Sequence, residues 1–455
     1  MGFEGEFASY EPLRRLLDSD KVKALESRLR IRKQDESDEQ NFESSITHKK
    51  DLNESPIQPD LVLAIDGSNI SAKAENGFPG AEFGYITIAS VLIDLKLIKE
   101  LEKVDFIEPK KFRETEKAST IDSVFPGCNV IIDAEKDAKA SLRRALFEEL
   151  KSNTVFSEGE TLLETYEHLL RIKREHFSDS RPPRSPIEGF EGDMTYGYGE
   201  YECPNTSEPL YSTDALRLHE LMNPSGSNGE LFGQIMATIE KLWLVHILRA
   251  FEYKGWLPTL RRVAFIMDGP LAVFSTSSWL TKAINYEITR INELQRKVNG
   301  QDLLIIGIEK SGTFYNHFID IDTTKDGITD KFPKQSALLL DDSYIKRNII
   351  FSESIKPYGQ DTYFGRKFFY KTSTGQKIVP VVAYFNKHQR NMDTAKPEQF
   401  PRLADVMHLL DKLVSSRYPN SVSPLVSAHA EAAIPLNLGK RIFEDIAREI
   451  RDKSE

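Results

Sequence analysis

Unbroken apolar runs, each bounded by polar residues, are the clearest pattern along this chain. Because every position in such a run is apolar, rather than every second one, the pattern indicates strands that are covered on both faces. The continuous runs occupy residues 61–65, 263–267 and 303–308, and a further strand-like run occupies 85–95. They predict the buried strands of one sheet.

Stretches with helical periodicity separate these runs. They lie at about 142–150, 162–172, 230–252, 277–298, 402–416 and 427–450. Two later strand-like segments, 364–372 and 377–385, flank a short polar turn and predict a hairpin. Strands and helices in alternation favour an α/β fold with a mixed sheet flanked by helices.

Two long segments lack either period. Residues 32–59 are polar and charged and follow one or two short helices within 12–31, so we expect a connector there. Residues 177–228 are rich in Pro, Gly, Ser and Tyr and predict an irregular insertion, either disordered or functional. The expected division is an N-terminal helical segment with its connector, 1–59, and one large domain, 60–455.

Composition narrows the picture only slightly. The chain has 40% hydrophobic residues, enough for a full core, and its 60 basic and 70 acidic residues give a net charge of −10. This charge does not favour nucleic acid as a partner, but one basic groove would suffice for phosphate contacts. Its two cysteines, Cys128 and Cys203, form no C-x-x-C pair. With no apolar leader and no run of about 18 apolar residues, we expect a cytoplasmic protein without a membrane partner.

Two of the expected strands lead into an aspartate followed by glycine, Asp66-Gly67 and Asp268-Gly269. An aspartate at a strand end lies at the carboxyl edge of the sheet, where open α/β sheets bind ligands. If the strands are neighbours, the carboxylates converge, and such like charges require protonation or a bridging metal ion. Oxygen ligands select Mg²⁺ or Mn²⁺. Either aspartate alone is more commonly a turn residue; the pair predicts a metal site.

A pair of such ions can cleave a phosphodiester, and their shell needs three or four carboxylate or imidazole ligands. Glu240 on the helix before the second aspartate and His429, which opens the last expected helix, are candidates to complete it. Their alternative roles are a solvated helix position and a capping or core histidine. Asp133, Asp341 and Asp342 also follow apolar runs and compete for these places.

Basic residues supply the remaining candidates. Lys310 follows the third buried strand and could bind a scissile phosphate as a point charge, or be an exposed strand end. The segment 365–371 interleaves Arg366, Lys367 and Lys371 with aromatic residues, as a DNA-binding groove would. An edge strand with basic side chains is the other interpretation.

Taken together, these motifs resemble the NurA nuclease family. The matching segments are GEFAS at 5–9, AIDGS at 64–68, IMDGPL at 266–271, GIEKSG at 307–312 and Ala428-His429. The resemblance covers most of the chain up to about residue 450, except the insertion at 177–228. It implies an RNase H-like fold and a Mn²⁺- or Mg²⁺-dependent nuclease that resects DNA ends with 5′ to 3′ polarity, as a homodimer docked on a HerA-type hexameric ATPase.

The resemblance also assigns residues. Asp66 and Asp268 match the two motif aspartates of the family, and His429 matches its late histidine. The family glutamate fits Glu240, with Glu230 or Glu252 as alternatives, and the family tyrosine fits Tyr418.

The resulting hypothesis is a metal-dependent DNA nuclease, exonuclease or endonuclease, that serves DNA end processing or defence against foreign DNA. One or two metal ions would be held by the two aspartates, and Lys310 would neutralise the phosphate. A DNA clamp or adaptor for a translocase, without hydrolysis, is the main alternative. A glycoside hydrolase that uses a carboxylate pair is the second.

Overall fold

The computed structural model describes most of the chain. The described residues are 11–29, 45–73, 80–96, 116–132, 134–177, 184–187, 190, 192–194, 196–323, 327, 330–414 and 422–433. They divide into two compact units, Met1–Ser45 and Ile46–Glu455. The first contains the short helices α1 (Glu11–Asp18) and α2 (Asp20–Glu26), as the sequence predicts for this region.

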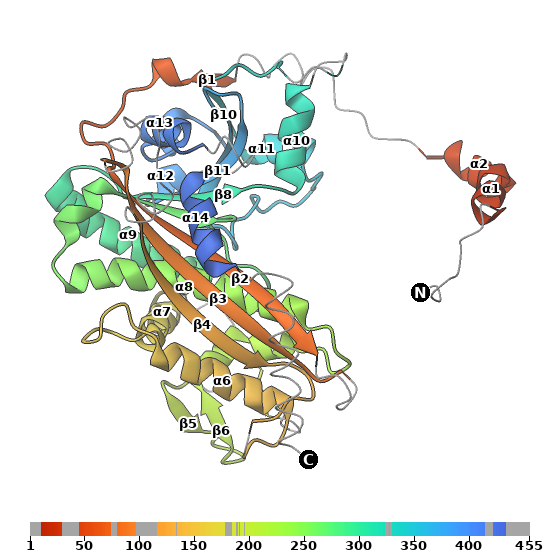
Figure 1. The fold of residues 1–455 in the computed structure, drawn as a ribbon, viewed down its shortest axis with the longest axis vertical. Coiled ribbons are helices and arrows are strands. Elements are labelled where there is room, and N and C mark those ends of the chain that lie inside the picture. Colours follow the sequence, from red (N-terminus) through yellow and green to blue (C-terminus); the bar gives the residue numbers. More distant parts are fainter. Residues whose placement is uncertain are drawn as a thin grey trace, which may run out of the picture. The chain divides into compact units, whose positions relative to one another are not determined.

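One large mixed sheet organises the second unit (Figure 1). Its nine strands within the described residues lie in the order β1-β9-β10-β11-β8-β7-β2-β3-β4. In chain order they are β1 (Ile46–His48), β2 (Leu61–Lys73), β3 (Glu82–Asp94), β4 (Glu116–Pro126), β7 (Val263–Asp268), β8 (Leu304–Glu309), β9 (Ser336–Leu339), β10 (Gly365–Lys371) and β11 (Lys377–Ala383). The pairs β2 with β7 and β7 with β8 are parallel, and the other pairs are antiparallel. The predicted mixed sheet and the hairpin of β10 and β11 are therefore confirmed.

Helices cover both faces of this sheet. One face packs against α6 (Ala138–Ser152), α7 (Leu162–His176), α8 (Gly229–Tyr253) and α9 (Leu280–Asn299) around a large apolar core. The other face packs against α13 (Leu403–Leu413) and α14 (Ser423–Ala432) around a second core. Figure 1 shows α14 lying along β2 and β3. With apolar helices on both sides, the central strands have continuous apolar runs.

A clamp at the start of β2 and β7 sets their register. The Asp60 carboxylate accepts hydrogen bonds from Arg262 at 2.8 and 3.0 Å, and the Asp60 amide donates to the Arg262 carbonyl at 3.0 Å. Leu61 then pairs with Val263, and the parallel register continues residue by residue as far as Ile65 and Met267, next to the site described below.

Two segments without periodicity contain more structure than the sequence indicates. Within the expected connector 32–59, β1 pairs with β9 and is part of the larger unit. Within the expected insertion, the second half is ordered by β5 (Glu200–Glu202), β6 (Pro209–Tyr211) and buried turns over 212–221. Arg143 of α6 holds this half through a buried bidentate ion pair to Asp214, with both hydrogen bonds at 2.7 Å.

Among the described helices, α8 is long and apolar enough by length and composition to cross a membrane, although Glu240 and Lys241 interrupt its apolar residues. However, 78% of its most apolar window is buried inside the protein. In this fold α8 is a core helix that packs on β2 and β3.

Candidate functional site

Asp66 and Asp268 lie side by side on neighbouring parallel strands. Ile65 pairs with Met267, so the next residue on each strand is one of the two aspartates. The Gly67 amide donates to the Asp66 carboxylate at 2.8 Å, and the Gly269 amide donates to the Asp268 carboxylate at 3.1 Å. The predicted convergence of the two side chains is therefore seen, and both carboxylates are oriented by the amide that follows them.

Only one of these aspartates ends its strand. Asp268 is the last residue of β7, but β2 continues for seven residues beyond Asp66. The prediction that β2 ends at Asp66 is wrong, because the polar residues from Ser68 onward remain paired with β3 as far as Lys73. Asp66 lies where its neighbour β7 ends, which gives it one open side.

Charge is concentrated at this position. Asp66 is only 2% exposed, and burial raises its pKa to about 8, with further contributions from the negative charges of Asp268 and Glu240 and an opposing one from Lys310. Buried like charges disfavour ionisation of each other unless a cation is close by. The pair thus has the electrostatics of a cation-binding site.

Lys310 provides one of the cationic groups beside the pair. It follows β8, the parallel neighbour of β7, and its Nζ lies 2.9 Å from Asp268 Oδ1. Both side chains are close to 30% exposed, so the pair contributes little to stability, on the order of 0–1 kcal/mol. The sequence placed Lys310 beside the same sheet edge, and the structure puts it there.

His429 approaches from the opposite helical layer. Its Nδ1 lies 3.1 Å from Asp66 Oδ2, and its side chain is 59% exposed. The sequence predicts that His429 opens the last helix. Because α14 begins at Ser423, His429 instead lies in the second turn of the last described helix. The histidine still reaches the first aspartate, with one ring nitrogen bonded and the ring open to solvent.

Glu240 of α8 lies against Gly67, the residue that follows Asp66. Its carboxylate is buried and accepts a hydrogen bond from Lys241 Nζ at 2.8 Å. A Cβ on Gly67 would lie 2.5 Å from Glu240 Oε1, so the absence of a side chain at Gly67 makes room for this carboxylate. Because side chains alternate along a strand, Gly67 faces α8 and Asp66 faces α14. Glu240 therefore lies on the other side of β2 from the Asp66 side chain.

The alternatives to Glu240 have other surroundings. Glu230 is exposed in the first turn of α8, and Glu252 binds Arg290 at 2.6 and 2.9 Å. Lys241, by contrast, was missed by the sequence analysis. A lysine within the apolar stretch 239–248 is a signal that it needs a buried partner, and that partner is Glu240.

The competing aspartates also have structural roles where they are described. Asp341 caps helix α11 (Asp342–Asn348) by accepting from the Tyr344 amide, and Asp342 accepts from the Tyr358 amide. Asp133 and Tyr418 lie outside the described residues.

The three basic residues expected to contact DNA do not form an exposed surface. Arg366, Lys367 and Lys371 are 1%, 4% and 1% exposed, because β10 lies inside the sheet between β9 and β11 and is not an edge strand. The Arg366 guanidinium donates hydrogen bonds to backbone carbonyls, among them those of Asn391 and Thr394. The prediction that these residues bind DNA is therefore corrected.

Each of the two lysines has a carboxylate partner. Lys367 pairs with Glu309 at 2.7 Å, and Lys371 pairs with Asp322 at 2.9 Å. A buried ammonium is tolerated only when it is paired and hydrogen-bonded, and both lysines meet this condition. Their role is to hold strands and helix α10 (Thr313–Asp322) together.

The donor set fits a hard divalent cation. The adjacent carboxylates of Asp66 and Asp268 are oxygen ligands of the kind that Mg²⁺ and Mn²⁺ prefer, and the pKa of Asp66 is raised first by burial and then by the neighbouring negative charges, which such an ion would offset. Among the described residues, no three His, Cys, Asp or Glu side chains are already gathered as a metal-binding group. Glu240 and His429 are the nearest further donors found.

A family model for the NurA domain matches residues 60–434. Among solved structures, the chain is similar to the NurA nuclease from Sulfolobus solfataricus, with 12% identity, coverage of 98% of this chain and 97% of that chain, and a TM-score of 0.30. It is also similar to a NurA structure with manganese, with 11% identity, coverage of 94% and 96%, and a TM-score of 0.25. Scores this low carry no structural argument. No curated protein matches.

Proposed function

Since this chain belongs to the NurA family, we propose that it is a divalent-metal-dependent deoxyribonuclease that hydrolyses phosphodiester bonds. The observation that carries the proposal is the register of β2 and β7, which places Asp66 beside Asp268 with Lys310 bonded to the second carboxylate. Two carboxylates and an ammonium at one open sheet edge suit a phosphodiester, because the metal-binding pair and a cation for the phosphate lie together.

Asp66 and Asp268 would hold the ion, His429 is proposed to complete the ligand set from the α14 face, and Glu240 would have to join it from the α8 face, past Gly67. When bound, Mn²⁺ or Mg²⁺ supplies Lewis acidity towards the phosphate and lowers the pKa of water. The chain itself contributes orientation. The Gly67 and Gly269 amides fix the two carboxylates.

Two further groups at the site have defined tasks in this proposal. Lys310 Nζ would neutralise a phosphate oxygen when its bond to Asp268 is exchanged. As the alternative to a ligand role, the exposed Nε2 side of His429 could exchange a proton with the substrate while Nδ1 stays bonded to Asp66.

Cleavage of linear DNA with Mn²⁺ tests the proposal directly. Wild type should cleave, Asp66→Asn and Asp268→Asn should each lose at least about 100-fold in rate, and the matched Asp122→Asn variant on β4 should cleave as wild type. Asp122 lies on the same sheet, and among the described residues its carboxylate accepts hydrogen bonds from the Tyr85, Thr87 and Thr120 hydroxyls. Cleavage that persists unchanged in Asp66→Asn would remove the site assignment.

Metal binding is measured separately, by the melting temperature with and without Mn²⁺. An ion that binds only the folded state raises the melting temperature of wild type, and Asp66→Asn should abolish the rise. Folded wild type that neither cleaves DNA nor responds to Mn²⁺ would be an adaptor without hydrolysis. Activity on a glycoside in the presence of a chelator would point to the carboxylate-pair hydrolase.

Finer points of the proposal follow from the family resemblance. We propose 5′ to 3′ end resection, one or two bound ions, a homodimer, and docking on a HerA-type hexameric ATPase. The fold is proposed to be RNase H-like, supported by the antiparallel strands β2–β4 joined through β2 to the parallel strands β7 and β8. Light scattering tests the dimer, co-purification with a co-expressed HerA-type ATPase tests the docking, and 5′- and 3′-blocked linear substrates test the polarity.

A further inference from the structure

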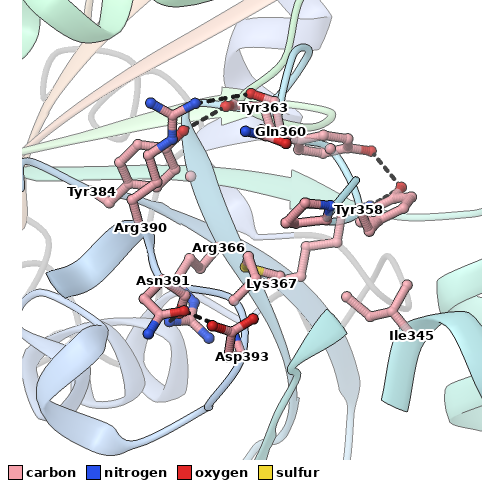
Figure 2. A pocket seen from close by; sticks show the side chains of 14 residues that line it. Ile345, Tyr358, Gln360, Tyr363, Arg366, Lys367, Tyr384, Arg390, Asn391 and Asp393 are labelled. Carbon is pink, nitrogen blue, oxygen red and sulfur yellow. Dashed lines mark hydrogen bonds between the residues drawn. The ribbon is translucent and has the colours of Figure 1, made fainter. Parts of the chain in front are cut away.

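Two pockets on the surface of the larger unit share part of their lining. The first, here called the tyrosine pocket, has a volume of about 160 Å³ and is lined by Tyr358, Tyr363 and Tyr384. The second, the α9 groove, has a volume of about 450 Å³ and runs along α9. Gln360, Tyr384 and Arg390 line both, so the two pockets are adjacent. Figure 2 shows Arg390 and Tyr384 on one side of the tyrosine pocket and Tyr358 with Lys367 on the other.

Cations without acidic partners line this path. Lys387 and Arg390, on the short helix α12 (Lys387–Arg390), form no ion pair within the described part of the chain, and Arg390 bonds only to the Gln360 carbonyl at 3.2 Å. Behind the wall, the buried Arg366 guanidinium is held by carbonyls, and its Nε has no hydrogen-bond partner. The path therefore carries positive charge that the protein does not neutralise locally.

Aromatic faces border the same path. Tyr286 of α9 lines the α9 groove and is 40% exposed; its ring stacks on His176 at a centroid distance of 4.5 Å and meets Phe177 edge to face at 6.4 Å. Tyr384 is fixed by its hydroxyl, which donates to the Tyr363 carbonyl at 2.8 Å. Rigid rings next to unpaired cations are the combination by which single-stranded nucleic acid is held, with bases on rings and phosphates on cations.

Backbone contacts join the segment at the tyrosine pocket to the segment that follows Asp268. The Phe364 amide donates to the Leu271 carbonyl at 2.9 Å, and Tyr363 forms a bridge with Ala272. Ala272 follows Asp268 by four residues, which limits their separation to about 14 Å even in a fully extended chain. The backbone beside the tyrosine pocket is therefore close to Asp268, within a distance that a few nucleotides span.

We propose that the tyrosine pocket and the α9 groove bind an unpaired stretch of the DNA strand. Lys387 and Arg390 contact its phosphates, and Tyr286 stacks on a base. We take the ligand to be single-stranded because an unpaired base offers its faces and edges freely to a ring inside a groove. Acidic residues also line the path, Glu293 on α9 and Asp393 at the tyrosine pocket, so the phosphates are expected at Lys387 and Arg390. This inference rests on the proposed function, since it names the form of the substrate that the same protein would hold.

Equilibrium binding without metal tests the inference, because no cleavage then interferes. The probe is a fluorescein-labelled oligothymidylate, followed by anisotropy in EDTA from 50 to 200 mM salt. Lys387→Ala/Arg390→Ala should weaken binding at least about tenfold and lower the slope of log K against log salt by about 1.4, from 0.7 per phosphate contact. Tyr286→Ala should weaken binding about fivefold or more. Lys297→Ala, an exposed lysine on α9 that does not line the groove, should bind as wild type.

The outcomes separate this inference from the proposed function. Groove variants that melt and bind oligothymidylate like wild type and Lys297→Ala would overturn the inference, even if wild type cleaves DNA. An equal loss of binding to a blunt duplex would overturn the assignment to a single strand. Groove-dependent binding by a wild type that cleaves nothing would support the groove and overturn the nuclease.

Discussion

A methyl group at Gly67 should disturb the site more than the fold. The new Cβ would lie 2.5 Å from Glu240 Oε1, 2.8 Å from Met236 Cγ and 3.0 Å from Ile88 Cδ1, whereas ordinary contacts begin at 3.4 Å. Glu240 must therefore move by roughly 1 Å, or α8 must shift away from β2. Overpacking of this kind costs about 1–3 kcal/mol of stability. A displacement of about 1 Å in a catalytic group can reduce the rate about 100-fold.

Urea unfolding and single-turnover cleavage of linear DNA with Mn²⁺ measure the two effects on Gly67→Ala. Gly233→Ala is the matched control, because it makes the same change on α8 at a position where a Cβ meets nothing within 4 Å. The control should gain about 0.5–1 kcal/mol, as expected for alanine in a helix, and cleave as wild type. If Gly67→Ala cleaves and unfolds like wild type, Glu240 does not act through its contact with this glycine.

Three further predictions concern stability, pH and charge. Burial lowers the pKa of His219 and His246 to about 4. The free energy of unfolding should therefore be highest above about pH 6.5 and decrease as the pH is lowered towards 4. In urea titrations, His219→Gln should make this decrease smaller. Asp214→Ala should cost about 3–5 kcal/mol in urea, because it leaves the Arg143 guanidinium buried without its carboxylate; a loss below 1 kcal/mol would contradict this. Lys310→Met should slow DNA cleavage at least about tenfold with an almost unchanged melting temperature, since its ion pair is partly exposed; an unchanged rate would exclude its proposed role.

The sequence predicts the central strands well, because residues covered on both faces are apolar at every position. This is why 263–267 and 303–308 match β7 and β8 to within one residue at each end. The pairing of Asp66 with Asp268 followed from the same runs, once parallel neighbours were assumed. The predictable part of the site is therefore the part that the sheet positions by itself.

Other parts depend on contacts that no local pattern records. The second half of β2 has a polar sequence, so its pairing with β3 could not be inferred from hydrophobicity. The basic residues of β10 suggested an exposed edge, yet β9 covers that side and carboxylates distant in the sequence neutralise the lysines. Glu240 fits where it does because Gly67 has no side chain, and these two residues are about 170 positions apart in the sequence.

The unequal settings of the two aspartates bear on how the chain can vary in length. A single-residue insertion within β2 on the N-terminal side of Asp66 would turn its carboxylate to the α8 face, because neighbouring positions on a strand face opposite ways. The same insertion after Asp268 would fall beyond the end of β7 and leave that carboxylate in place. Changes of length near this site are thus compatible with the architecture on one side only, in the turn that follows Asp268.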